Sequence, residues 1–148
     1  MGGARRVKRA WATTLIVGCT VLRAAPVCAD GSGLEVAAHC DRAPAPGRVL
    51  CEVSAKPRSG RLVWSDVLVV RAPEFARPLR SRVLAVLGTS PELATAKLAL
   101  VAVQPGQGRL DLLVRGVICQ AANAAQGCKA VSQPLSAVLE VGPPPPAP

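Results

Sequence analysis

Apolar residues occupy every second position in segment after segment of this 148-residue chain. Successive side chains of a β-strand point to opposite faces of a sheet, so this period predicts strands that bury one face. Stretches rich in proline and glycine separate the segments, as turns between strands require. About seven strands are predicted in this way, over residues 34–40, 49–54, 61–71, 83–87, 97–103, 109–119 and 135–141. The chain is therefore expected to be all-β.

One region leaves a helical alternative open. The run Thr89-Ser90-Pro91-Glu92 has the form of a helix start, with an N-cap hydroxyl and a glutamate at capping-box spacing, and it predicts a short helical turn over residues 90–96. Residues 97–103 are almost continuously apolar, which is typical of a central strand, although a buried helix extending from Ser90 would have the same composition. The strands and turns together predict a small antiparallel β-sandwich of the immunoglobulin-like kind. Its core is expected to include Val63, Val67 and Val69.

Four cysteines after residue 29 fall into two close pairs, Cys40 with Cys51 and Cys119 with Cys128. In the hairpin predicted over residues 34–54, Cys40 and Cys51 point to the same face, and opposed residues of antiparallel strands lie within reach of a disulfide. Four cysteines allow three pairings, and pairing within each cluster closes the shortest rings. Rings of about 12 and 10 residues would each stabilise the fold by roughly 2–3 kcal/mol. The sequence therefore predicts two local, structural disulfides.

The N-terminus has the layout of a secretory signal peptide. Four basic residues lie within the first nine, residues 10–22 are apolar or small, and small residues precede Asp30. We expect residues 1–29 to be removed and the mature protein to be secreted or periplasmic, where thiols oxidise. The apolar run is shorter than the roughly twenty residues of a spanning helix, so no stable membrane span is predicted. The alternative is a lipoprotein anchored through Cys19, whose surroundings resemble a bacterial lipobox, but that cleavage would leave Cys28 as an odd thiol.

Residues 30–141 suffice for a single domain with one hydrophobic core. Residues 142–148 include five prolines and are expected to form a disordered, extended tail outside the sheets. The formal charge of +9 falls to about +4 without the leader, which contains five basic residues and no acid. The mature chain has no tyrosine, one phenylalanine and one tryptophan, so side chains on which nucleobases stack are scarce. No nucleic-acid partner is predicted.

Residues 72–82 contain two prolines and the densest positive charge of the mature chain, and we interpret them as a loop. A basic loop is usually a solvated face. The functional alternative is contact with an anionic partner, either lipid headgroups, an acidic envelope polymer or an acidic protein face. The residues that would make this contact are Arg71, Arg77, Arg80 and Arg82.

The residues that carry catalytic chemistry form no recognisable constellation. His39 is the single histidine and lies on the outward phase of its strand, which favours an exposed polar residue over a metal ligand. The nine acids are scattered singly, and the chain has no Gly-x-Ser-x-Gly elbow, phosphate-binding glycine loop or Cys-x-x-Cys pair. The sequence thus predicts no enzyme, no metal and no cofactor.

Two hypotheses about function follow. The first is an exported, disulfide-stabilised β domain that acts as a non-catalytic binding or structural accessory module of the cell envelope, with an unidentified protein or an anionic envelope component as its partner. The second is a periplasmic thiol–disulfide exchange partner that uses Cys119 and Cys128, because this pair flanks a loop of alanine, glutamine and glycine that is expected to be exposed, so the bond would be accessible.

Overall fold

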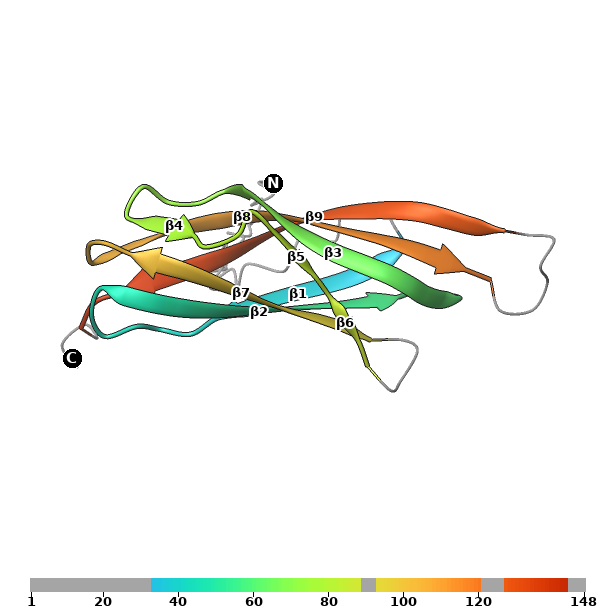
Figure 1. Cartoon of the computed structure of the whole chain (residues 1–148), viewed down its shortest axis with the longest axis horizontal. Helices are drawn as coiled ribbons and strands as arrows, with labels where there is room; N and C mark the ends of the chain where they lie inside the picture. Colours follow the sequence, from blue (N-terminus) through green and yellow to red (C-terminus); the bar gives the residue numbers. More distant parts are fainter. Residues whose placement is uncertain (1–32, 89–92, 121–126, 144–148) are drawn as a thin grey trace, which may run out of the picture.

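In the computed structural model, the described part of the chain consists of residues 33–88, 93–120 and 127–143, and it forms nine β-strands and no helix (Figure 1). The prediction of an all-β fold is confirmed. The expected signal peptide and most of the expected tail lie outside the described residues. The strands are β1 (Leu34–Cys40), β2 (Gly47–Pro57), β3 (Arg61–Arg71), β4 (Ala76–Pro78), β5 (Arg82–Leu84), β6 (Val86–Leu87), β7 (Ala94–Ala102), β8 (Gly106–Cys119) and β9 (Cys128–Val141).

The strands belong to two antiparallel sheets, as predicted. One sheet has the order β1-β2-β7-β4, with the short β6 also paired to β7, and the other has the order β5-β3-β8-β9. In an immunoglobulin sandwich one sheet contains strands A, B and E and the other contains C, F and G. Here β1, β2 and β7 occupy the first three places, and β3, β8 and β9 occupy the others. This order favours the immunoglobulin-like interpretation, which stays a prediction at that level of detail.

The core lies between the sheets and is filled by leucine, valine and alanine. Buried and more exposed positions alternate along β2, β7 and β8, following the period-two pattern of the sequence. Phe75 packs over β8 at the rim of the core, where a Cβ added to Gly106 would lie 2.7 Å from the phenyl ring. Glycine at this position therefore makes room for the single phenylalanine. The largest fully buried side chains come from both sheets and are Leu62, Leu98, Leu100, Leu110, Leu112 and Leu139.

At both edges of the two-sheet structure, backbone pairing connects one sheet to the other. Residues 76–87 pair with β7 through β4, then with β3 through β5, and then with β7 again through β6. The change of sheet is abrupt, because Leu79 is hydrogen-bonded to β7 and Ser81, two residues later, is hydrogen-bonded to β3. On the opposite side Ala43 follows β1 and donates its N–H to the carbonyl oxygen of Glu140 on β9.

The helical turn predicted over residues 90–96 is wrong where the structure describes it. Residues 94–96 begin strand β7, while residues 89–92 lie outside the described residues. The strand prediction for the following apolar run is confirmed, and its helical alternative is wrong. β7 pairs with β2 on one side and with β4 and β6 on the other, and it buries Ala96 and Leu98. Pairing on both sides and burial outweigh the local helix-start signal.

Two further predictions need correction. The loop predicted over residues 72–82 contains β4 and the start of β5, and Pro78 is tolerated because β4 pairs with β7 alone. The single strand predicted over residues 83–87 is divided between β5 and β6, which lie in different sheets. Val63 is not in the core but 42% exposed, because a bulge after Leu62 shifts the phase of β3.

Candidate functional site

A cluster of four side chains lies on the outer face of the β5-β3-β8-β9 sheet. It contains the most deeply buried charged side chain among the described residues. Asp66 on β3 has an exposed fraction of 0%. Arg115, directly opposite on β8, donates two hydrogen bonds to it, with Nε 2.9 Å from Oδ1 and Nη2 2.6 Å from Oδ2. Arg82 on β5 adds a third from Nε to Oδ2 at 2.5 Å. The centroid of the Trp64 ring lies 5.9 Å from Cζ of Arg82 and 5.9 Å from Cζ of Arg115. We call Trp64, Asp66, Arg82 and Arg115 the Asp66 cluster.

The charges of the Asp66 cluster hold one another in their ionised forms. Burial opposes ionisation of Asp66, but the hydrogen bonds and the positive charges of Arg115 and Arg82 together outweigh burial and hold the pKa of this carboxyl below its ordinary value of 3.8. The same hydrogen bonding to Asp66 raises the pKa of Arg115. The carboxylate is therefore ionised at neutral pH, and both its oxygens accept hydrogen bonds from the arginines. Chemically, the cluster fastens edge strand β5 across the face of β3 and β8.

Sequence reasoning missed this cluster. Asp66 is the one acidic residue of β3, which was an available signal, but its two arginine partners lie 16 and 49 residues away. Period-two alternation also places Asp66 on the outward face, where an acid needs no explanation. The burial arises from side chains on neighbouring strands, and a local pattern contains no information about them.

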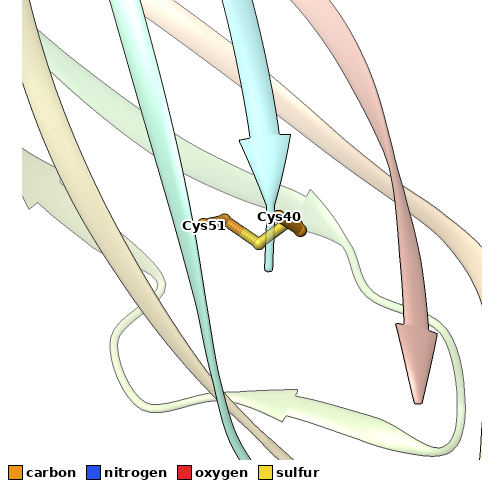
Figure 2. The surroundings of a disulfide bond; sticks show 2 residues. All are labelled: Cys40 and Cys51. Carbon is orange, nitrogen blue, oxygen red and sulfur yellow. A yellow bond between two sulfur atoms is a disulfide. The ribbon is translucent and has the colours of Figure 1, made fainter. Parts of the chain in front are cut away.

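Both predicted disulfides are present. Cys40–Cys51 joins β1 to β2 at directly opposed positions, with Cα atoms 3.9 Å apart (Figure 2). Cys51 is 1% exposed and belongs to the core. Cys119–Cys128 joins the end of β8 to the start of β9, with Cα atoms 4.1 Å apart, and Cys128 is exposed. Two disulfides indicate an oxidising, extracytoplasmic environment.

The four arginines predicted to contact an anionic partner do not share one surface element. Arg71 ends β3, opposite Asp111 on β8. Hydrogen bonds from Arg109 and Ser136 hold the pKa of Asp111 below 3.8, burial opposes this, and the charge of Arg71 adds a smaller lowering. The remaining three occupy the segment that closes one side of the molecule, and one of them, Arg82, is engaged by Asp66.

Arg77 and Arg80 are exposed and lie on either side of Leu79, which is 59% exposed. Arg77 belongs to β4, whereas Arg80 lies at the point where the chain passes from one sheet to the other. Neither arginine takes part in an ion pair among the described residues.

The outer face of the β1-β2-β7-β4 sheet carries a shallow hollow of about 370 Å³. His39, Glu52 and Lys97 lie in one row across β1, β2 and β7 and line it together with Ala37 and Leu50. His39 is exposed, as its strand phase predicted. The row places both signs of charge beside an apolar surface, so the lining of the hollow is mixed and indicates no single ligand chemistry.

Within residues 33–88, 93–120 and 127–143, no group of three or more histidine, cysteine or acidic side chains is arranged to hold a metal ion. The same residues include no helix that is long and apolar enough to cross a membrane. Comparison of the chain with protein-family models, with curated proteins and with solved structures finds no match.

Proposed function

We propose that this protein is an exported, disulfide-stabilised β domain that acts as a non-catalytic binding or structural accessory module of the cell envelope. Its disulfides support a location outside the cytosol. The basic, then apolar, then small-residue pattern of residues 1–29 supports cleavage by signal peptidase, with lipidation at Cys19 as the alternative.

The observation that carries this proposal is how the chain uses its buried charge. Asp66 is the one acidic or basic side chain buried among the described residues, and Arg82 and Arg115 occupy both its oxygens. A general acid or base works best with a pKa near the operating pH. The pKa of Asp66 is instead displaced further from neutrality, and its carboxylate holds three strands together. A structural role for Asp66 supports the proposal that the domain is a non-catalytic module.

The partner surface that we propose consists of Arg77, Leu79 and Arg80. Two cations without ion-pair partners among the described residues flank an exposed apolar side chain. Such a group complements an anionic lipid surface, because the arginines meet the headgroups while the leucine reaches the boundary of the acyl chains. An anionic component of the envelope is therefore the partner favoured by charge.

Sedimentation with lipid vesicles tests this surface. The mature protein should bind phosphatidylglycerol vesicles and not phosphatidylcholine vesicles, and binding should weaken when salt rises from about 0.05 to 0.3 M, because the Debye length shortens. The double variant Arg77→Gln/Arg80→Gln should lose roughly thirtyfold in affinity, because each arginine near an anionic surface contributes about 1 kcal/mol. The matched control Arg48→Gln/Lys56→Gln removes two exposed charges from β2 and should bind phosphatidylglycerol vesicles with the wild-type affinity. Equal losses in the two variants, or equal binding to both lipids, would contradict the proposal.

Thiol–disulfide exchange is the second candidate function, and the position of Cys119–Cys128 favours it. Cys128 is exposed on edge strand β9, whereas Cys51 of the other disulfide lies in the core. The reduction potential separates the two functions, since structural disulfides lie below about −300 mV and exchanging ones lie above. Equilibration with glutathione buffers, read separately for the two bonds by peptide mass mapping, measures it. A Cys119–Cys128 potential below this value would remove the second candidate.

A further inference from the structure

The Cys119–Cys128 bond has two unequal ends. β8 is flanked by β3 and β9, so neighbouring strands stand on both sides of Cys119, which is partly buried. Among the described residues β9 is the edge strand of its sheet, so no strand of that sheet flanks Cys128 on the side away from β8, and Cys128 is exposed. A thiolate that attacks a disulfide must approach the sulfur in line with the S–S bond, so access decides which sulfur is attacked. Residue exposure therefore favours attack at the Cys128 end of the bond.

The less accessible end has a cation as its cross-strand neighbour. Arg61 on β3 is directly opposite Cys119 on β8, and the next pair, Leu62 and Ile118, is buried on the inner face. Arg61 and Cys119 therefore share the outer face, where directly opposed Cβ atoms lie roughly 5 Å apart. Arg61 is exposed and forms no ion pair with an acid among the described residues.

The turn before β3 fixes this neighbour in place. Gly60 has a φ of +77°, and a Cβ added there would lie 2.8 Å from the carbonyl oxygen of Cys119. Only a residue without a side chain allows the two backbones to approach so closely. The register of Arg61 against Cys119 is thereby set by backbone packing as well as by the ladder of β3 and β8.

We propose that this disulfide reacts with a fixed polarity: an external thiolate attacks Sγ of Cys128, and Cys119 leaves as a thiolate stabilised by Arg61. The inference rests on the second candidate function for its biological use. Arg61 acts through Cys119 and is a positioning residue. A nearby positive charge favours the thiolate form, and a thiol of lower pKa is the better leaving group.

Reduction of the Cys119–Cys128 bond needs two electrons, and a partner dithiol supplies them. Its first thiolate forms a bond to Cys128 Sγ while the Cys119–Cys128 bond breaks, and the electron pair of that bond goes to Cys119. The second thiolate of the dithiol then attacks the first sulfur of the same dithiol, which is bonded to Cys128 in the mixed disulfide. This attack releases Cys128 as a thiolate. Two electrons have passed from the dithiol, now a disulfide, to the cysteine pair, and solvent supplies protons as pH requires. The reverse sequence oxidises the pair.

Trapping with a monothiol tests the polarity. The mature protein is mixed with limiting glutathione, quenched in acid within the first tenth of the reaction and mapped by mass. Glutathione should be on Cys128 at least tenfold more often than on Cys119. Equal labelling, or a majority on Cys119, would overturn the proposal.

The contribution of Arg61 is read from rates and from a pH profile. Arg61→Gln should slow the attack roughly threefold, as expected for the loss of one partly screened charge near the leaving sulfur. In the reduced protein the same variant should raise the pH midpoint of Cys119 alkylation by iodoacetamide, and Arg61→Lys should restore both values. Arg48→Gln, an exposed arginine of the other sheet, should change neither. A loss in Arg61→Gln that lysine fails to restore would show a structural effect and reject the assignment.

Failure of the second candidate function remains distinguishable from failure of this inference. A reduction potential as low as that of structural disulfides removes the function, whichever sulfur is attacked. A potential in the exchanging range with glutathione distributed equally leaves the function and removes the polarity.

Discussion

Asp66 occupies an outward strand position, where water would normally solvate a carboxylate, yet none of its surface is exposed. Two arginines from different strands cover and neutralise it, and Trp64 lies beside both guanidinium groups. An ionised group taken out of water is tolerated only when its hydrogen-bonding capacity is used. Each arginine makes only part of these contacts, whereas the carboxylate of Asp66 takes part in all the hydrogen bonds of the cluster.

Replacing Asp66 should destabilise the fold. Asp66→Asn keeps the size of the side chain but removes its charge, and it replaces one acceptor oxygen with an NH2 donor that faces the N–H groups of Arg82 and Arg115. We expect a cost of about 2 kcal/mol. The cost is at the lower end for a buried ion pair, because both arginines are partly exposed to solvent. Urea unfolding measures it. Asp111→Asn on the same sheet face is the control and should cost clearly less, since its partner Arg109 is largely exposed.

The pKa of Asp66 also predicts a dependence of stability on pH. Its folded-state pKa lies below 3.8, so the ionised carboxylate stabilises the fold above that pH, and the contribution is lost as pH falls through the folded pKa. The difference in unfolding free energy between wild type and Asp66→Asn should therefore be constant above about pH 5 and shrink in more acidic solution. Asp111 titrates in both proteins and cancels in the difference. A difference that grows on acidification would contradict the ionised assignment.

At the scale of elements, the two hairpins that carry disulfides are built alike but face different environments. Both bonds join directly opposed positions of adjacent strands, with sequence separations of 11 and 9. In β2 the bonded cysteine points into the core, whereas in β9 it is exposed. Similar ring lengths predict similar entropic contributions, so any difference in their effect on stability reports the surroundings.

Removing the disulfides one at a time should separate the two contributions. Cys40→Ala/Cys51→Ala loses the ring closure and also leaves a space in the core, so we expect a cost of about 3–4 kcal/mol. Cys119→Ala/Cys128→Ala should cost about 2–3 kcal/mol, the ring-closure contribution alone. Chemical unfolding of the two double variants measures both values. A larger loss from the second variant would mean that the β8–β9 end is more important for the fold than its exposure indicates.

At the scale of the whole molecule, the segment over residues 76–87 connects the two sheets by pairing with β7, β3 and β7 in turn. The opposite side is closed where Ala43 bonds to β9. The core between them contains residues of both sheets in one cluster. A structure whose sides are closed in this way is expected to unfold as one cooperative unit.

Trp64 offers a direct measurement of that cooperativity. It is the only tryptophan after residue 29, and it lies in the Asp66 cluster, where β5 meets β3 and β8. We expect urea unfolding followed by its fluorescence to coincide with unfolding followed by far-ultraviolet circular dichroism. Should fluorescence change at lower urea than circular dichroism, β5 and the segment around it would detach before the sheets separate.

Much of the fold was accessible from local pattern. The alternation along residues 34–40 and 49–54 determined which side chains face inward, and it placed Cys40 and Cys51 on one face at disulfide distance. The short spacing of Cys119 and Cys128 predicted the second bond, because pairing within each cluster closes the shortest rings. These predictions succeeded because side-chain direction in a strand and the closure of a short ring depend on residues close in sequence.

Only the tertiary structure decided the rest. The bulge after Leu62, the division of residues 83–87 between two sheets and the strand form of residues 94–96 depend on which strands become neighbours. The same holds for the burial of Asp66, whose partners are remote in sequence. The physical reason is common to all four. The period of a strand specifies the face on which a side chain lies, whereas hydrogen-bond partners and solvent exposure are specified by chain that arrives from elsewhere.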